Sequence, residues 1–98
     1  MNDKLLNFDI ADYLDNEEVI AEYINEALAS VEQDGDLNVL LAAISDVAKA
    51  RGMTQVAKDA GLGRESLYKT LAPDAKPRYE TVSKLLAAMG LRVGVVPV

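Results

Sequence analysis

The sequence contains no cysteine, no histidine and no tryptophan, and it has a single phenylalanine. The absence of cysteine excludes disulfides and thiolate metal sites, and the absence of histidine removes the commonest general base and the commonest zinc ligand. The apolar runs are far shorter than the roughly 20 residues that a membrane-spanning helix needs. The first residues, Met1 to Lys4, lack the basic and apolar regions of a signal peptide. We therefore expect a cytoplasmic protein.

Catalytic motifs are also lacking. The sequence has no glycine-rich phosphate loop and no cluster of residues with metal-ligand spacing. The adjacent acids Glu17 and Glu18 would not face one site on a helix, and Ser45 and Ser66 have no base in any recognisable pattern. The sequence therefore predicts a protein that is not an enzyme and that uses no cofactor and no metal ion.

The chain does contain enough apolar residues for one core. Half of its 98 residues are hydrophobic, and a chain of this length builds one compact domain rather than two. Charge divides the chain, because residues 1–36 carry eleven acids and one base, whereas residues 37–98 carry nine bases and five acids. We expect an acidic N-terminal extension, residues 1–35, attached to a mildly basic remainder, residues 36–98.

Apolar periodicity and capping residues predict an all-α fold of about five helices. The first helix has an apolar stripe formed by Val19, Ile20, Tyr23, Ile24, Ala27 and Leu28. Asp36 can cap the second helix and Gly52 can end it, while Pro73 and Pro77 indicate a loop before the last helix. The second helix is expected between Asp36 and Gly52, and the other expected bounds are 17–31, 54–60, 64–71 and 79–89.

The C-terminal residues 91–96 alternate weakly and are rich in valine, a pattern typical of a β-strand. A lone strand is unstable because its edges are unpaired. We therefore expect a short C-terminal β-strand that pairs with a second copy of the chain, which would make the protein a homodimer. The alternative is a disordered apolar tail.

Residues 54–71 have the spacing of a helix-turn-helix. The small side chain of Ala57 allows two short helices to cross closely, and Gly61 can adopt a turn conformation that other residues resist. Leu67 would anchor the second helix in the core. The pattern turns four other side chains outward, on a helix that would fit the major groove of DNA. They belong to Arg64, Glu65, Tyr68 and Lys69.

Each outward side chain suits a contact with DNA. Arg64 can donate two hydrogen bonds to a guanine, and Lys69 can neutralise a phosphate. Tyr68 can contact a phosphate or a thymine methyl, and Glu65 can accept from cytosine or orient Arg64. The two polar residues that begin the first short helix can bind backbone phosphates. They are Thr54 and Gln55.

Two longer stretches resemble a known family. They are FDIADYLDNEEVIAEYINEAL, which begins at Phe8, and LLAAISDVAKARGMTQVAKDAGLGRESLYKTLAPDAKPRYETVSKLLAAMGLRVGV, which ends at Val95. Together they resemble the addiction-module antidote proteins, small helix-turn-helix antitoxins often encoded beside RelE/HigB-like toxins in bacteria. The resemblance implies a lambda-repressor-like helical domain, a homodimer that binds its own operator through the six residues named above, and neutralisation of a partner toxin.

The acidic N-terminal third is the part of the chain expected to contact such a toxin. Toxins of the RelE kind act on ribosome-bound RNA and are basic, so an acidic segment would complement their charge. Apolar and aromatic anchors concentrate binding energy, and the candidates are Tyr13, Leu14, Ile20 and Tyr23. We place the contact within residues 5–32. The alternatives are that these side chains pack on the chain's own core, and that the acidic helix limits non-specific DNA binding.

Two other functions fit the same residues. One is a stand-alone phage-type repressor without a toxin, which would differ only in its neighbouring genes. The other is a protein-interaction module that no longer binds DNA, which the low net charge of the motif leaves open, since residues 53–84 carry six bases against four acids. The motif also departs from the usual pattern at Gly63, which stands where a serine or threonine would cap the second short helix.

Overall fold

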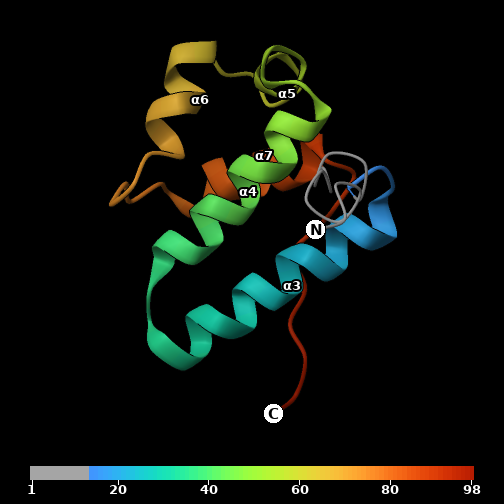
Figure 1. The fold of residues 1–98 in the computed structure, drawn as a ribbon, viewed down its shortest axis with the longest axis vertical. Helices are drawn as coiled ribbons and strands as arrows, with labels where there is room; N and C mark the ends of the chain where they lie inside the picture. Colours follow the sequence, from blue (N-terminus) through green and yellow to red (C-terminus); the bar gives the residue numbers. More distant parts are fainter. Residues whose placement is uncertain (1–13) are drawn as a thin grey trace, which may run out of the picture.

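The computed structural model describes residues 14–98, and five helices make up the regular structure of that part of the chain (Figure 1). They are α3 (Glu17–Asp34), α4 (Leu37–Arg51), α5 (Met53–Asp59), α6 (Arg64–Thr70) and α7 (Tyr79–Ala88). The prediction of an all-α fold is confirmed for these residues. Each predicted helix is present, and its bounds differ from the expected ones by at most three residues.

Helices α3 and α4 form a hairpin whose turn is defined by local signals. The side chain of Asn16 accepts a hydrogen bond from the N–H of Val19 at 2.9 Å and so caps the start of α3. Gly35 ends that helix with φ of 72°, a left-handed conformation that favours glycine. The carboxylate of Asp36 then accepts from the N–H of Asn38 at 3.0 Å and caps α4, as the sequence predicted.

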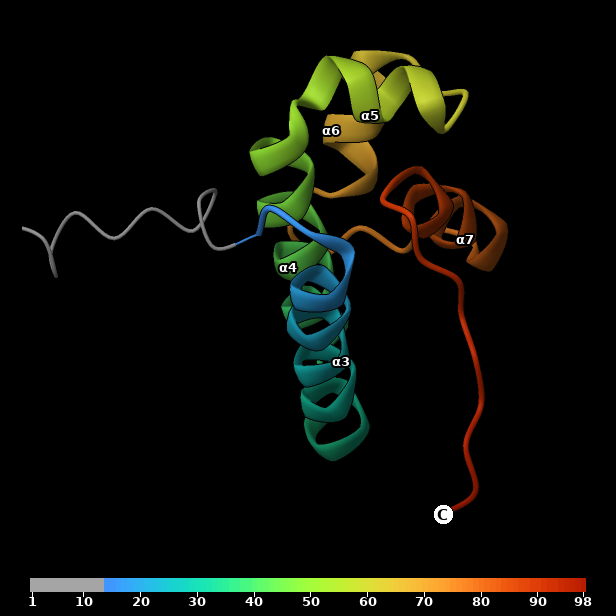
Figure 2. The same ribbon diagram turned by 90° about the vertical axis from the view of Figure 1, so that its right-hand side faces the viewer.

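The other helices lie at one end and one side of the hairpin. α5 and α6 sit at the end of the molecule where α4 finishes, and α7 lies beside them (Figures 1 and 2). All five helices contribute to one apolar core, whose most deeply buried side chains include Ile20, Leu41, Ile44, Val47, Val56, Leu67, Leu85 and Met89. The acidic helix α3 is therefore part of the same core as the helices that follow it.

The prediction of a C-terminal β-strand was wrong. Residues 91–98 form no strand and leave the helices as an extended segment (Figure 2), in which Val95 is 96% exposed. A strand requires a neighbour to complete its hydrogen bonds, and no second extended segment of residues 14–98 pairs with this one. The homodimer expected from that strand stays a prediction. Within the same residues, no helix is long and apolar enough to cross a membrane.

Candidate functional site

Helices α5 and α6 form a compact unit joined by a short turn. Ala57 is almost completely buried, and its carbonyl oxygen accepts a hydrogen bond from the N–H of Leu62 at 2.8 Å. Gly61 has φ of +71°, in the left-handed region that a side chain disfavours. Leu67 is completely buried and fixes the inner side of α6 in the core. These three positions therefore play the structural parts that their spacing predicted.

The outer side of α6 carries the four predicted side chains, and all of them are exposed. The Arg64 guanidinium lies over the ring of Tyr68, 5.7 Å from the ring centroid, and Nη2 donates a long hydrogen bond to the Tyr68 hydroxyl at 3.4 Å. This cation–π contact lies one helical turn along the axis and holds both side chains on the same face. Glu65 and Lys69 form no ion pair within residues 14–98. The face presents two cations, one acid and one phenol to solvent.

The start of α5 carries the other two predicted DNA-binding residues. Thr54 and Gln55 are both exposed. The Gln55 side-chain amide donates to the Asp59 carboxylate at 2.8 Å, so a phosphate contact by this amide would have to replace that bond. Gly63 precedes α6 in an extended conformation without a side-chain cap. The first backbone N–H groups of α6 therefore receive no capping interaction from residue 63, which has no side chain.

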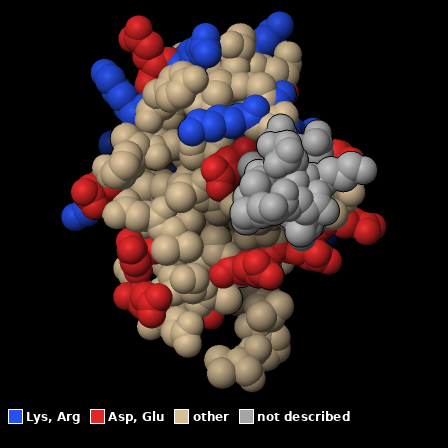
Figure 3. Space-filling model, in the orientation of Figure 1, with Lys and Arg blue, Asp and Glu red and all other residues tan. Residues whose placement is uncertain are grey.

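Charge is distributed unevenly over the described surface. Residues 14–36 contain eight acids and no base, whereas residues 49–70 contain five bases and two acids. In Figure 3 the blue side chains gather around the end that carries α5 and α6, and red side chains dominate the opposite half. One of the five bases, Arg51, is already engaged. Its guanidinium lies 2.9 Å from the Glu17 carboxylate, and this hydrogen bond lowers the pKa of Glu17.

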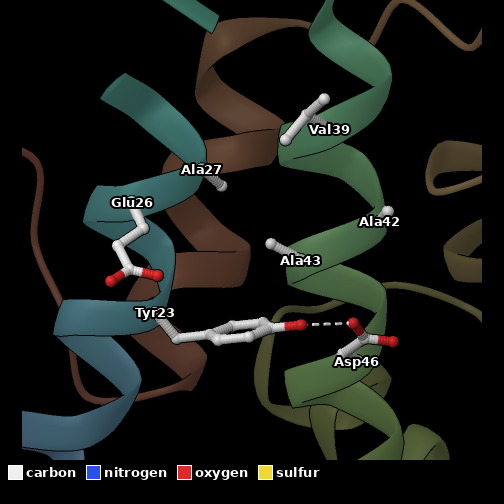
Figure 4. A pocket seen from close by; sticks show the side chains of 7 residues that line it. All are labelled: Tyr23, Glu26, Ala27, Val39, Ala42, Ala43 and Asp46. Carbon is white, nitrogen blue, oxygen red and sulfur yellow. Dashed lines mark hydrogen bonds between the residues drawn. The ribbon is translucent and has the colours of Figure 1, made fainter. Parts of the chain in front are cut away.

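The predicted toxin anchors have different positions in the structure. Tyr13 lies outside the described residues. Leu14 and Ile20 are buried, with 2% and 0% of their surfaces exposed, so either side chain would have to leave the core to contact a partner. Tyr23 is partly exposed on α3, and its hydroxyl donates to the Asp46 carboxylate on α4 at 2.6 Å (Figure 4). Desolvation and this hydrogen bond raise the pKa of Tyr23 to about 12.

Tyr23 also marks an open groove between α3 and α4 with a volume of about 420 Å³. Its walls come from both helices and are shown in Figure 4: Tyr23, Glu26, Ala27, Val39, Ala42, Ala43 and Asp46. Sequence reasoning missed the four residues on α4. Their spacing of three, four and seven places them on one side of that helix, next to the side that buries Leu40, Leu41 and Ile44. Among residues 14–98, no group of three or more acids could hold a metal ion.

Comparison with known proteins decides the family. Residues 4–97 match the protein family described as "Probable addiction module antidote protein". The chain belongs to this family. A relative of this antidote-family protein is an "uncharacterized protein" of Haemophilus influenzae, 41% identical over 92 residues, which are 94% of this chain and 91% of the relative. No solved structure matches the chain at a significant level.

The resemblance seen in the sequence is thus confirmed at the level of the family, and membership points to a role in a toxin–antitoxin module. The described part of this antidote-family protein has two distinctive surfaces. One is the exposed side of α6 with its cations, and the other is the acidic side of α3 with the groove next to it. They lie toward different ends of the molecule (Figures 1 and 3).

Proposed function

We propose that this antidote-family protein is a DNA-binding antitoxin that represses its own operon and neutralises a partner toxin. The observation that carries the DNA-binding part is the outer side of α6. Four polar side chains there are exposed while Leu67, on the inner side of the same helix, is completely buried. In a helix-turn-helix, the element that enters the major groove is a short helix whose inner side packs in the core and whose outer side is polar.

The contacts follow from the chemistry of that face. Arg64, at the start of α6, is the residue that would read a guanine, since N-terminal residues of a recognition helix reach base edges. Tyr68 holds the guanidinium in place through the stacking contact at 5.7 Å, and Glu65 can accept from a cytosine amino group. Lys69 and Thr54 are assigned to backbone phosphates, and Gln55 joins them if its amide exchanges Asp59 for a phosphate oxygen.

The wider architecture we propose is lambda-repressor-like and dimeric. A homodimer would present two copies of α6 to successive major grooves about 34–36 Å apart, which would require an operator with two-fold symmetry. The charge distribution supports this orientation. Phosphates attract the basic end formed by α5 and α6, and they repel the acidic α3 at the other end.

The same acidic surface supports the second half of the proposal. A RelE/HigB-like toxin is a small basic protein, and the 23 residues from 14 to 36 present eight acids and no base. Complementary charge of this kind accelerates encounter and disfavours wrong partners. Toxin and operator would then occupy different ends of one molecule.

Fluorescence anisotropy tests the DNA-binding part. The protein is titrated onto labelled DNA from upstream of its own gene, with random DNA of equal length as the competitor. We expect Arg64→Ala to weaken specific binding by about 1–3 kcal/mol, and Lys69→Ala to reduce the slope of log affinity against log salt concentration by about 0.9. Lys84→Ala on α7, which removes the same charge from an exposed site outside α5 and α6, is the matched control and should change neither quantity.

Two results would overturn the proposal. Equal affinity for upstream and random DNA at low salt would leave the protein without sequence-specific binding, and an interaction module would then describe it better. Equal losses in Arg64→Ala and Lys84→Ala would show that the outer side of α6 is not the reading surface.

A further inference from the structure

The groove between α3 and α4 has the form of a binding site for a helix. It runs along two helices that lie side by side, and its volume of about 420 Å³ is within the range of roughly 300–1,000 Å³ found for ligand pockets. Ala27, Ala42 and Ala43 are small, so their helices leave space between them that larger side chains would fill. Two helices with an open trough between them accept the side-chain ridge of a third helix.

The two long walls of the groove each carry an acid. Glu26 lies on α3 and Asp46 on α4 (Figure 4). Neither carboxylate forms an ion pair within residues 14–98. Asp46 accepts the Tyr23 hydroxyl through Oδ2, and its other oxygen keeps its capacity to accept from a cation. The groove therefore combines an apolar floor with two acidic rims.

A lysine or arginine side chain matches that combination. Its aliphatic stem packs on an alanine surface while its charged end reaches a carboxylate, which is how these residues commonly lie across apolar surfaces. Arginine fits best, since its planar guanidinium can donate to two carboxylates at once. An acidic helix would be repelled, because α3 already contributes six acids and no base to this side of the molecule.

We propose that this groove receives an amphipathic helix of the toxin, which inserts an arginine or lysine between Glu26 and Asp46. This inference rests on the proposed antitoxin function and names the surface and the kind of segment that it uses. It transfers the centre of the contact from the buried Leu14 and Ile20 to the exposed junction of α3 and α4. Of the predicted anchors in the described residues, Tyr23 is retained, as the end wall of the groove.

The test compares groove variants with matched controls in the full-length protein. Glu26→Gln and Asp46→Asn remove the two charges without changing shape, and Glu32→Gln removes an exposed acid of α3 outside the groove. Ala42→Trp fills the groove from an exposed position, and Ala87→Trp makes the same change at an exposed position of α7. The probe is the purified small basic protein encoded beside this gene, titrated calorimetrically. Operator DNA is titrated in parallel.

We expect the Glu26→Gln/Asp46→Asn double variant to bind the toxin at least about tenfold more weakly, with less dependence on salt. Ala42→Trp should weaken it at least as much by exclusion. Glu32→Gln and Ala87→Trp should stay within about threefold of the wild type, as exposed sites away from an interface do. DNA affinity should be the same for all four variants, which shows that each of them is folded.

The outcomes separate the inference from the function on which it rests. If the wild type binds the toxin and the groove variants bind it as well as the controls do, the groove is not the toxin site and the antitoxin function stands. If the wild type binds no such protein, the antitoxin function and the groove inference both fail, while DNA binding is judged by its own titration. If the groove variants change only self-association in sedimentation velocity, a second copy occupies the groove and the inference is overturned.

Discussion

The hydrogen bond from Tyr23 to Asp46 joins α3 to α4 across the open groove, and removing it measures how firmly the acidic helix is held. Tyr23→Phe deletes the hydroxyl and nothing else. The bond is short, at 2.6 Å, and its acceptor is a carboxylate, a class that contributes about 1.5–3 kcal/mol when it is well shielded. Tyr23 is partly exposed, so water replaces part of the interaction. We expect the free energy of unfolding to fall by about 1 kcal/mol, which lowers Tm by about 4–8 °C.

The same bond makes this contribution depend on pH. Desolvation and the bond to Asp46 raise the pKa of Tyr23 to about 12, above the value of about 10 in an unfolded chain. Between these values the unfolded chain has released the proton and the folded chain still holds it, so stability decreases as pH rises. The contribution of the hydroxyl is present in full below about pH 10 and is lost as pH rises through about 12.

Urea denaturation followed by far-UV circular dichroism measures both effects. The difference between wild type and Tyr23→Phe should be about 1 kcal/mol near neutral pH and should shrink once the pH rises above about 10. Tyr68→Phe is the control, because the exposed Tyr68 hydroxyl accepts only a long hydrogen bond from Arg64. This substitution should change the free energy of unfolding by no more than about 0.5 kcal/mol. A double-mutant cycle with Asp46→Ala isolates the pair. A coupling energy of zero, or a difference that does not change with pH, would refute the reasoning.

Two further predictions concern the α5–α6 unit. Leu67→Ala should lower the free energy of unfolding by about 2–5 kcal/mol, because Leu67 is completely buried. Leu28→Ala, at a side chain that is 37% exposed, should lower it much less. Similar denaturation midpoints for the two variants would contradict this assignment of the core. Gly61→Ala should lower stability by about 1–2 kcal/mol because φ is +71° there, while Gly63→Ser, at φ of −70°, should leave it unchanged or raise it by a few tenths through a cap. Thermal melts that rank these two glycine variants in the opposite order would show that the turn does not impose the strain we assign to it.

Local signals in the sequence accounted for most of the helical structure. Helix ends depend on residues within one turn, and Asp36 and Gly52 mark the ends of α4 that were predicted from them. The turn before α6 was predictable for the same reason, since Gly61 and Leu67 act through local conformation and a single buried position. Features that depend on interactions within one helical turn could therefore be predicted from the sequence alone.

Non-local features were not predictable in this way. Alternation in residues 91–96 gives no information on whether a second strand lies alongside, and the pattern was read as a strand that the structure does not contain. The groove depends on how two helices sit against each other, so Asp46 and Ala42 had no visible role in the sequence. Periodicity placed Ile20 and Tyr23 on one apolar stripe of the first helix. Only the packing of the helices shows that Ile20 is buried, whereas Tyr23 lies at the edge of the stripe and donates a hydrogen bond through its hydroxyl.

The inclusion of α3 in the common core has a thermodynamic consequence. Ile20 and Ile24 on the acidic helix are buried among residues of the other helices, so the acidic surface cannot unfold alone without exposing the apolar surface beneath it. Any molecule that binds only folded α3 therefore stabilises the whole chain by mass action, by about 2.7 kcal/mol at a concentration one hundred times its Kd. Occupancy at the acidic end thus also stabilises α6, which carries the proposed DNA contacts, without any change of shape between the two ends.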